Sequence, residues 1–133
     1  MAVVIGISRR GTFSLRRVAR ALDSFNLRYM VQGHLKIARH SILVTGRVKG
    51  VGFRYHVLWL ARKQKLAGFA ANCVEGVWIE IEGSGDRLDF FLNSLRSNPP
   101  LFSKITGLRV KAISLRGDKE FKIASDLMSL PVE

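Results

Sequence analysis

Three glycines are crowded into the stretch VTGRVKGVGFR, residues 44–54, which ends in Arg54. Glycine is costly in any regular element, so the cluster of Gly46, Gly50 and Gly52 indicates a sharp turn or the close approach of a ligand. Consecutive backbone N–H groups at a glycine-rich turn before a helix can form a concave site for phosphate. Arg54 follows at the helix entrance, where a planar guanidinium can bind two phosphate oxygens. A plain turn followed by a solvated arginine explains the same residues, and the stretch alone leaves both explanations open.

The flanking residues predict a strand before the glycines and a helix after them. SILVTGRV, from residue 41, carries the apolar residues of a strand, and YHVLWLARKQKL has helical spacing as far as a stop near Gly68. Trp59 and Leu60 are expected in the core. His56 lies about 200° around the helix from Arg54, so we expect it on the surface rather than in a site.

Two further strands and a second helix follow downstream. GFAANCV and GVWIEIEG are predicted strands joined by a short turn, and Ser84 caps a predicted helix that ends near Arg96. Leu88, Phe91, Leu92 and Leu95 form its buried stripe. KITGLRVKAIS and EFKIA supply the last strands, which gives the order βαββαβ with both helices on one face of the sheet.

The composition fits one domain plus an appendage. The chain has 133 residues, 47% of them apolar, and no apolar run approaches the roughly 20 residues of a membrane span. A single cysteine, Cys73, excludes an internal disulfide, and without a motif-supported base it is expected to be a small buried filler. His34, His40 and His56 lack metal-ligand spacing. We therefore expect a cytoplasmic protein without a metal.

The formal net charge of +12 is concentrated at the start of the chain. Residues 1–40 carry +7, and Leu15, Val18, Leu22 and Phe25 repeat there at helical spacing opposite Arg16, Arg17 and Arg20. This basic leader has three interpretations: an organelle-targeting segment, an arm for anionic surfaces, or a helix packed on the domain. Residues added by an upstream start codon are a fourth. We predict a leader over 1–40, a domain over 41–126 and a tail over 127–133.

The glycine stretch resembles the first signature motif of acylphosphatases, and GFAANCVEGVW, residues 68–78, resembles the second. Two motifs in the right order make a specific signal, which covers about residues 40–125. The resemblance implies an α+β ferredoxin-like sandwich, with two helices packed on one face of an antiparallel sheet. It also implies hydrolysis of acyl phosphates to carboxylate and inorganic phosphate, without a metal, another cofactor or a covalent intermediate.

The same resemblance assigns roles to individual residues. Asn72 is implied to position the attacking water, and the phosphoryl group is implied to be held by Lys49, Gly50, Val51, Gly52, Phe53 and Arg54. These roles suit the chemistry, because an acyl phosphate already has a good leaving group and needs mainly positioning and charge stabilisation. Taken without the resemblance, Asn72 is more simply a turn residue at the end of a strand.

The chain departs from the acylphosphatase pattern at three positions. Lys49 stands where the family usually has glutamine, Ala71 where a basic residue is common, and Trp78 where valine is usual. The segment NPPLFSKITGLRV resembles the acylphosphatase-like domain that opens the carbamoyltransferases of hydrogenase maturation, although Tyr55 stands where that subgroup has proline. A non-catalytic module of such an assembly is therefore one alternative function.

An RNA-binding ferredoxin-like domain is the other alternative, which the positive charge favours. Such domains read RNA with exposed aromatic side chains on their two central strands. The strand SILVTGRV has no aromatic residue. The strand with Trp78 carries Glu80 and Glu82, which we expect to face solvent and repel phosphates. The sequence thus favours a small acyl phosphate over nucleic acid as the partner.

Overall fold

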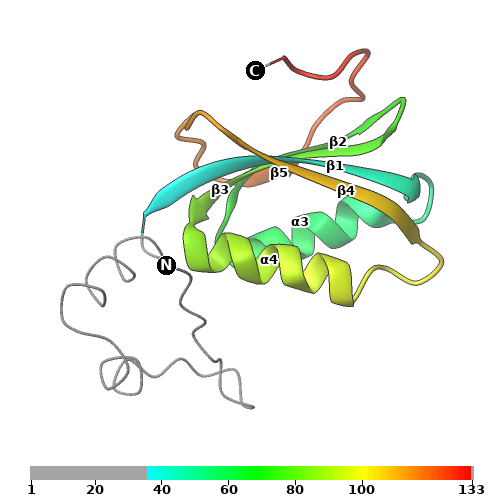
Figure 1. Ribbon diagram of the computed structural model, residues 1–133, viewed down its shortest axis with the longest axis horizontal. Coiled ribbons are helices and arrows are strands. Elements are labelled where there is room, and N and C mark those ends of the chain that lie inside the picture. Colours follow the sequence, from blue (N-terminus) through cyan, green and yellow to red (C-terminus); the bar gives the residue numbers. More distant parts are fainter. Residues whose placement is uncertain (1–35, 133) are drawn as a thin grey trace, which may run out of the picture. The chain divides into compact units, whose positions relative to one another are not determined.

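The computed structural model describes residues 36–132. Residues 1–35 of the predicted leader lie outside the described residues. The elements are β1 (Ile37–Arg47), α3 (Phe53–Lys63), β2 (Ala67–Cys73), β3 (Gly76–Ser84), α4 (Gly85–Ser97), β4 (Lys104–Ile113) and β5 (Phe121–Ile123). Both helices cover the same face of the sheet (Figure 1). The predicted βαββαβ order is confirmed, and the short β5 lies within EFKIA, which was predicted as the last strand.

The strands form one sheet in the order β4-β1-β3-β2-β5. Neighbouring strands are antiparallel except β2 and β5, which pair in parallel from Gly68–Phe121 to Ala70–Ile123. The sheet is therefore mixed rather than wholly antiparallel. The reason is that the chain reverses after β4 and adds β5 to the far edge in the direction of β2.

The core lies between the sheet and the helix layer. Ile42 and Val44 of β1 and Ile79 of β3 are fully buried there. The helices supply buried side chains at helical spacing, and these are Phe53, Val57, Leu60 and Ala61 from α3 and Leu88, Phe91 and Leu95 from α4. Each large apolar side chain that is fully buried stabilises the fold by roughly 1.5–3 kcal/mol. This packing fixes the start of α3 against the sheet.

Trp59 is not a core residue, so that prediction was wrong. Its side chain is 57% exposed, whereas Leu60 is only 5% exposed. Because a helix turns about 100° per residue, Val57 and Leu60 share the buried side of α3 and Trp59 falls on the opposite side. None of the helices among residues 36–132 is both long enough and apolar enough to span a bilayer.

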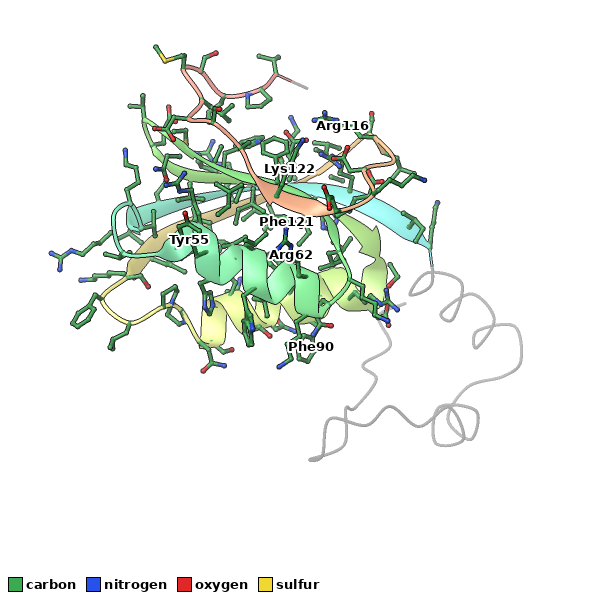
Figure 2. All side chains as sticks on the ribbon, turned by 180° about the vertical axis from the view of Figure 1, so that it is seen from behind. Tyr55, Arg62, Phe90, Arg116, Phe121 and Lys122 are labelled. Atoms are coloured by element: carbon green, nitrogen blue, oxygen red, sulfur yellow. The ribbon has the colours of Figure 1, made fainter. Side chains whose placement is uncertain are left out.

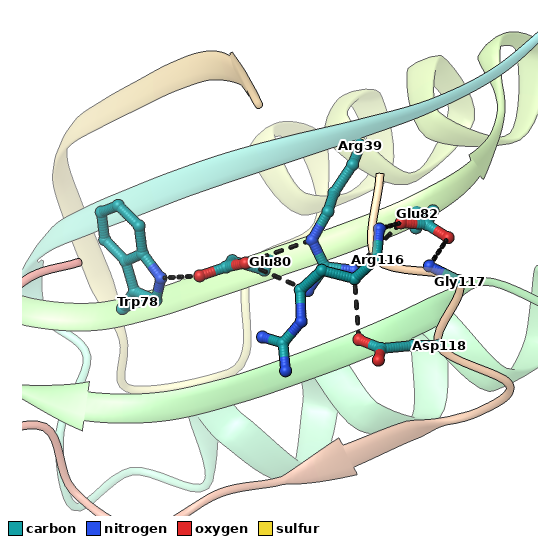
Figure 3. A network of polar contacts seen from close by, with 7 residues as sticks. All are labelled: Arg39, Trp78, Glu80, Glu82, Arg116, Gly117 and Asp118. Atoms are coloured by element: carbon teal, nitrogen blue, oxygen red, sulfur yellow. Dashed lines mark hydrogen bonds and ion pairs between the residues drawn. The ribbon is translucent and has the colours of Figure 1, made fainter. Parts of the chain in front are cut away.

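β1 begins at Ile37, four residues before the predicted strand, and this brings Arg39 into the sheet. Arg39 is 1% exposed and pairs with Glu82 across the sheet. Its guanidinium donates two hydrogen bonds to Glu80 Oε1, of 3.1 and 3.0 Å, and one of 3.2 Å to Glu82 Oε1. A further bond of 3.1 Å reaches Asp118 Oδ2. Figure 3 shows this network.

Glu80 and Glu82 are therefore buried, not solvent-facing as the sequence analysis expected. They are 6% and 8% exposed. Glu82 also accepts hydrogen bonds from the backbone N–H groups of Arg116 and Gly117, at 2.8 and 2.9 Å, and Glu80 accepts one from the Trp78 indole at 3.0 Å (Figure 3). Glu80 and Glu82 do lie on the same side of β3, but a strand pattern does not reveal a buried cation on the neighbouring strand.

Candidate phosphate-binding site

The three glycines between β1 and α3 serve two different purposes. Gly46 lies against the backbone of β4, where a Cβ atom would collide with the carbonyl oxygen of Lys104. Gly50 and Gly52 adopt left-handed backbone conformations, with φ of +74° and +76°, and a Cβ at either would meet nothing within 4 Å. The first glycine is thus required by strand packing. The other two shape a loop that borders space left open by residues 36–132, which is what a ligand requires.

This loop leads directly into the positive end of a helix. The first backbone hydrogen bond of α3 runs from His56 N to Gly52 O at 3.1 Å, so the N–H groups of residues 53–55 lie ahead of the helical ladder. The first turn of α3 contains no acidic residue. Unpaired N–H groups and the helix dipole together favour an anion at this position.

Arg54 and Asn72 come from α3 and β2, which pack against each other. Arg54 is the second residue of α3, and its side chain is 30% exposed. Asn72 lies near the end of β2 opposite Val77, which is a core residue of β3. The Oδ1 atom of Asn72 is buried and has no hydrogen-bond partner among residues 36–132. An unpaired buried carbonyl costs roughly 1–3 kcal/mol, and such groups are typical of sites that bind a water or a ligand.

The segment after β5 brings these two residues to the same corner of the molecule. Asp126 Oδ1 lies 3.9 Å from Arg54 Nη1, and the next residue, Leu127, donates its backbone N–H to Asn72 O at 2.8 Å. The backbone N–H of Ala124 bonds to Ala70 O at 2.9 Å, so the segment follows β2 beyond the end of β5. Asp126 and Leu127 are consecutive in the chain, so their contacts place Arg54 and Asn72 close together.

Lys49 ties the loop to the end of β2 through its side chain. Its ammonium donates hydrogen bonds of 3.0 Å to Cys73 O and 3.4 Å to Val74 O. The resemblance implied a phosphate contact for Lys49 but no bond from its side chain to β2. Its side-chain contact and the position of Asp126 beside Arg54 were missed, because neither long-range pairing leaves a signal in a single sequence.

Two other polar residues near the loop take structural positions. Cys73 is 5% exposed, as expected for a small filler, and burial raises the pKa of its thiol, which disfavours a nucleophilic thiolate. His56 is half-buried rather than on the surface, on the flank of α3 that meets Asn98, and burial lowers its pKa. Among residues 36–132 there is no group of three or more acidic, histidine or cysteine side chains that could hold a metal ion.

Comparisons with known proteins show which family the chain belongs to. The family model described as Acylphosphatase matches residues 40–123, which is more than half of the chain and includes the loop, Arg54 and Asn72. The chain belongs to the acylphosphatase family. An acylphosphatase of Bacillus subtilis is 42% identical over 87 residues, a match that spans 64% of this chain and 94% of the relative. One from Archaeoglobus fulgidus is 37% identical over 84 residues, or 62% of this chain and 93% of the relative.

Solved structures of acylphosphatases have the same fold. The crystal structure of the Bacillus subtilis enzyme superposes with a TM-score of 0.63 at 41% identity, over 67% of this chain and 99% of that one. Full-length HypF, in its phosphate- and nucleotide-bound form, gives a TM-score of 0.67 at 35% identity. That match covers 68% of this chain but only 12% of HypF. The ferredoxin-like sandwich is therefore confirmed. The likeness to HypF, a carbamoyltransferase, concerns only a small part of HypF.

Proposed function

We propose that this acylphosphatase hydrolyses the carboxyl–phosphate anhydride of small acyl phosphates at the corner formed by the loop, Arg54 and Asn72. Water adds to phosphorus, and the bond between phosphorus and the acyl oxygen breaks. The carboxylate leaves with that bonding pair, and the proton of the attacking water goes to inorganic phosphate or to solvent. Because the carboxylate is a good leaving group, no strong base is required.

Arg54 and the loop backbone from Lys49 to Phe53 would hold the phosphoryl group. The left-handed Gly50 and Gly52 support this role, because they turn the backbone without placing a side chain where the phosphate would lie. The N-terminus of α3 adds a fixed positive potential. These groups are in place before the substrate arrives, which is the arrangement that stabilises charge in a phosphoryl-transfer transition state.

Asn72 would position the water, and its unpaired Oδ1 is the observation that carries the proposal. A buried amide oxygen without a partner can accept a hydrogen bond from a water at no loss of another contact. An amide does not change protonation near neutral pH, so it would orient the water rather than deprotonate it.

The direct test is hydrolysis by the purified full chain of acetyl phosphate, carbamoyl phosphate and a phosphomonoester, each with and without a chelator. We expect both acyl phosphates to be cleaved at rates that the chelator leaves unchanged, and the phosphomonoester to be cleaved poorly. Inorganic phosphate should inhibit competitively, because the product occupies the same loop. Loss of activity with chelator, or preference for the phosphomonoester, would count against the proposal.

A non-catalytic module of a carbamoyltransferase is a second candidate, supported by the 35% identity with the corresponding part of HypF. It predicts that phosphate binds but that no acyl phosphate turns over, so the same assay separates the two. A cytoplasmic location stays a prediction, which fractionation of cells would check.

A further inference from the structure

α3 exposes aromatic and cationic side chains on the side opposite the core. Tyr55 is 66% exposed and Trp59 is 57% exposed, and Arg62 and Lys63 are exposed beside them. Figure 2 shows Tyr55 and Arg62 on this helix. Together with Leu58 these side chains line an open hollow. We call the five residues the α3 face.

The α3 face is positively charged without compensation from its own helix. No residue of α3 is acidic, and the acidic residues of the helix layer, Asp86 and Asp89, belong to α4. The two exposed rings lie in one hollow, and a contiguous exposed apolar surface commonly marks a contact with another molecule. The positive charge of the α3 face favours an anionic partner.

We propose that the α3 face binds the surface of a membrane that contains anionic lipids. Tyrosine and tryptophan are enriched where hydrocarbon meets water, because each has an apolar ring and a polar tip. Arg62 and Lys63 lie next to the rings, where their long stems would let the charged groups reach lipid phosphates. The helix would lie on the membrane rather than cross it.

The rings are poorly arranged for the other common anionic partner, single-stranded nucleic acid. Stacking of bases requires an open aromatic face. Lys63 Nζ lies over the Trp59 ring, 4.9 Å from its centroid, and the His56 ring lies 6.3 Å away at an angle of 36°. The Lys63 ammonium therefore competes with a base for stacking on the indole, although the Trp59 side chain stays 57% exposed.

The sequence of the leader supports the same partner. Leu15, Val18, Leu22 and Phe25 alternate with Arg16, Arg17 and Arg20 in the pattern of a basic amphipathic helix, which is typical of segments that lie on anionic membranes. Stable attachment commonly takes two weak signals acting together. The proposal itself concerns the α3 face alone, and it stands whether or not the chain hydrolyses acyl phosphates.

Trp59 itself provides the readout. The chain has two tryptophans, so Trp78→Phe leaves Trp59 as the sole indole. We expect full-length Trp78→Phe to show a blue-shifted emission with vesicles of phosphatidylcholine and phosphatidylserine in equal parts, and none with phosphatidylcholine alone. Bromine-labelled lipids should quench that emission. If Trp78→Phe does not fold, the difference between the spectra of the wild type and Trp59→Phe gives the same information.

A charge reversal with a matched control tests the cations. Each basic residue near an anionic membrane contributes about 1 kcal/mol, or about fivefold in partitioning, so Arg62→Glu/Lys63→Glu should weaken vesicle binding at least about 25-fold. Lys104→Glu/Arg109→Glu changes the total charge equally at exposed positions of β4 and should weaken it much less. Equal losses in both variants would overturn the proposal. So would vesicle binding that leaves the Trp59 emission unchanged, or an emission shift with single-stranded RNA but not with vesicles.

Discussion

The side-chain ammonium of Lys49 lies 3.0 Å from the backbone carbonyl oxygen of Cys73 and donates a hydrogen bond to it. This bond joins the phosphate loop to β2 at the residue that follows Asn72. The distance between the loop and Asn72 is therefore set partly by the side chain of Lys49. Lys49 acts in this account as a positioning residue.

Lys49→Met should lower kcat/KM for acetyl phosphate roughly tenfold, because a hydrogen bond from a charged group contributes about 1.5 kcal/mol or more. Lys49→Gln should retain most of the activity, since its amide can still donate to Cys73 O. Steady-state kinetics of the two variants, with exposed Lys119→Met as control, checks this. Equal activity of the methionine and glutamine variants would remove the role of the bond.

Arg39→Met should destabilise the fold by about 3–5 kcal/mol, because it leaves Glu80 and Glu82 buried without their cation. Urea unfolding followed by circular dichroism measures the loss. Arg109→Met, at an exposed position of β4, is the control and should change stability by less than about 0.5 kcal/mol. If Arg39→Met lost no more stability than Arg109→Met, the network would contribute little to the fold.

The boundary of the domain can be tested with two fragments. Residues 36–133 contain all of β1 and should fold and retain activity without residues 1–35, because both motifs lie downstream. Residues 41–133 lack the first four residues of β1, Arg39 among them, and they should be far less stable. Comparison of their thermal unfolding decides the point. Failure of both fragments to fold would show that the leader belongs to the core, and equal stability would show that β1 does not need Arg39.

Stability should fall in acid because of Glu82. Burial favours the neutral acid, but hydrogen bonds from Arg116 N, Arg39 and Gly117 N outweigh it and hold the pKa of Glu82 below its usual range. Its contribution is thus complete above the unfolded pKa of about 4.3 and is lost as the pH falls through the lower folded value. The free energy of unfolding, measured by urea at several pH values, should decline less steeply in Glu82→Gln. Exposed Glu120→Gln is the control and should decline as steeply as the wild type. A decline just as steep in Glu82→Gln would exclude Glu82 as the cause.

The sequence predicted the fold well because hydrophobic spacing decides which face of an element is buried. Leu88, Phe91 and Leu95 lie in the core as their spacing indicates. Trp59 was misplaced, because its position on α3 lies away from the buried side that Val57 and Leu60 share. Glu80 and Glu82 were misplaced because their partner, Arg39, is more than forty residues away in the chain. A strand pattern shows which side chains share a face but not what covers that face.

The candidate site was less accessible to sequence reasoning. The glycine cluster indicated the loop, yet only the structure separates Gly46, which packs against β4, from Gly50 and Gly52, which border open space. The pairing of Asp126 with Arg54 depends on how the segment after β5 follows β2, which no local pattern encodes. Asn72 had no distinctive signal apart from its motif.

The most direct test of the account compares Asn72→Ala with Arg54→Ala in two measurements on the same folded proteins, which are turnover of acetyl phosphate and competitive inhibition by inorganic phosphate. Asn72 would touch only the water, so its loss should cut kcat about 100- to 1,000-fold and leave the inhibition constant nearly unchanged. Arg54 would bind the phosphoryl group throughout, so its loss should weaken phosphate inhibition and also reduce kcat, and Arg54→Lys should restore little of either. Full turnover by folded Asn72→Ala would contradict the account, because residues 68–78 would then have only a structural role.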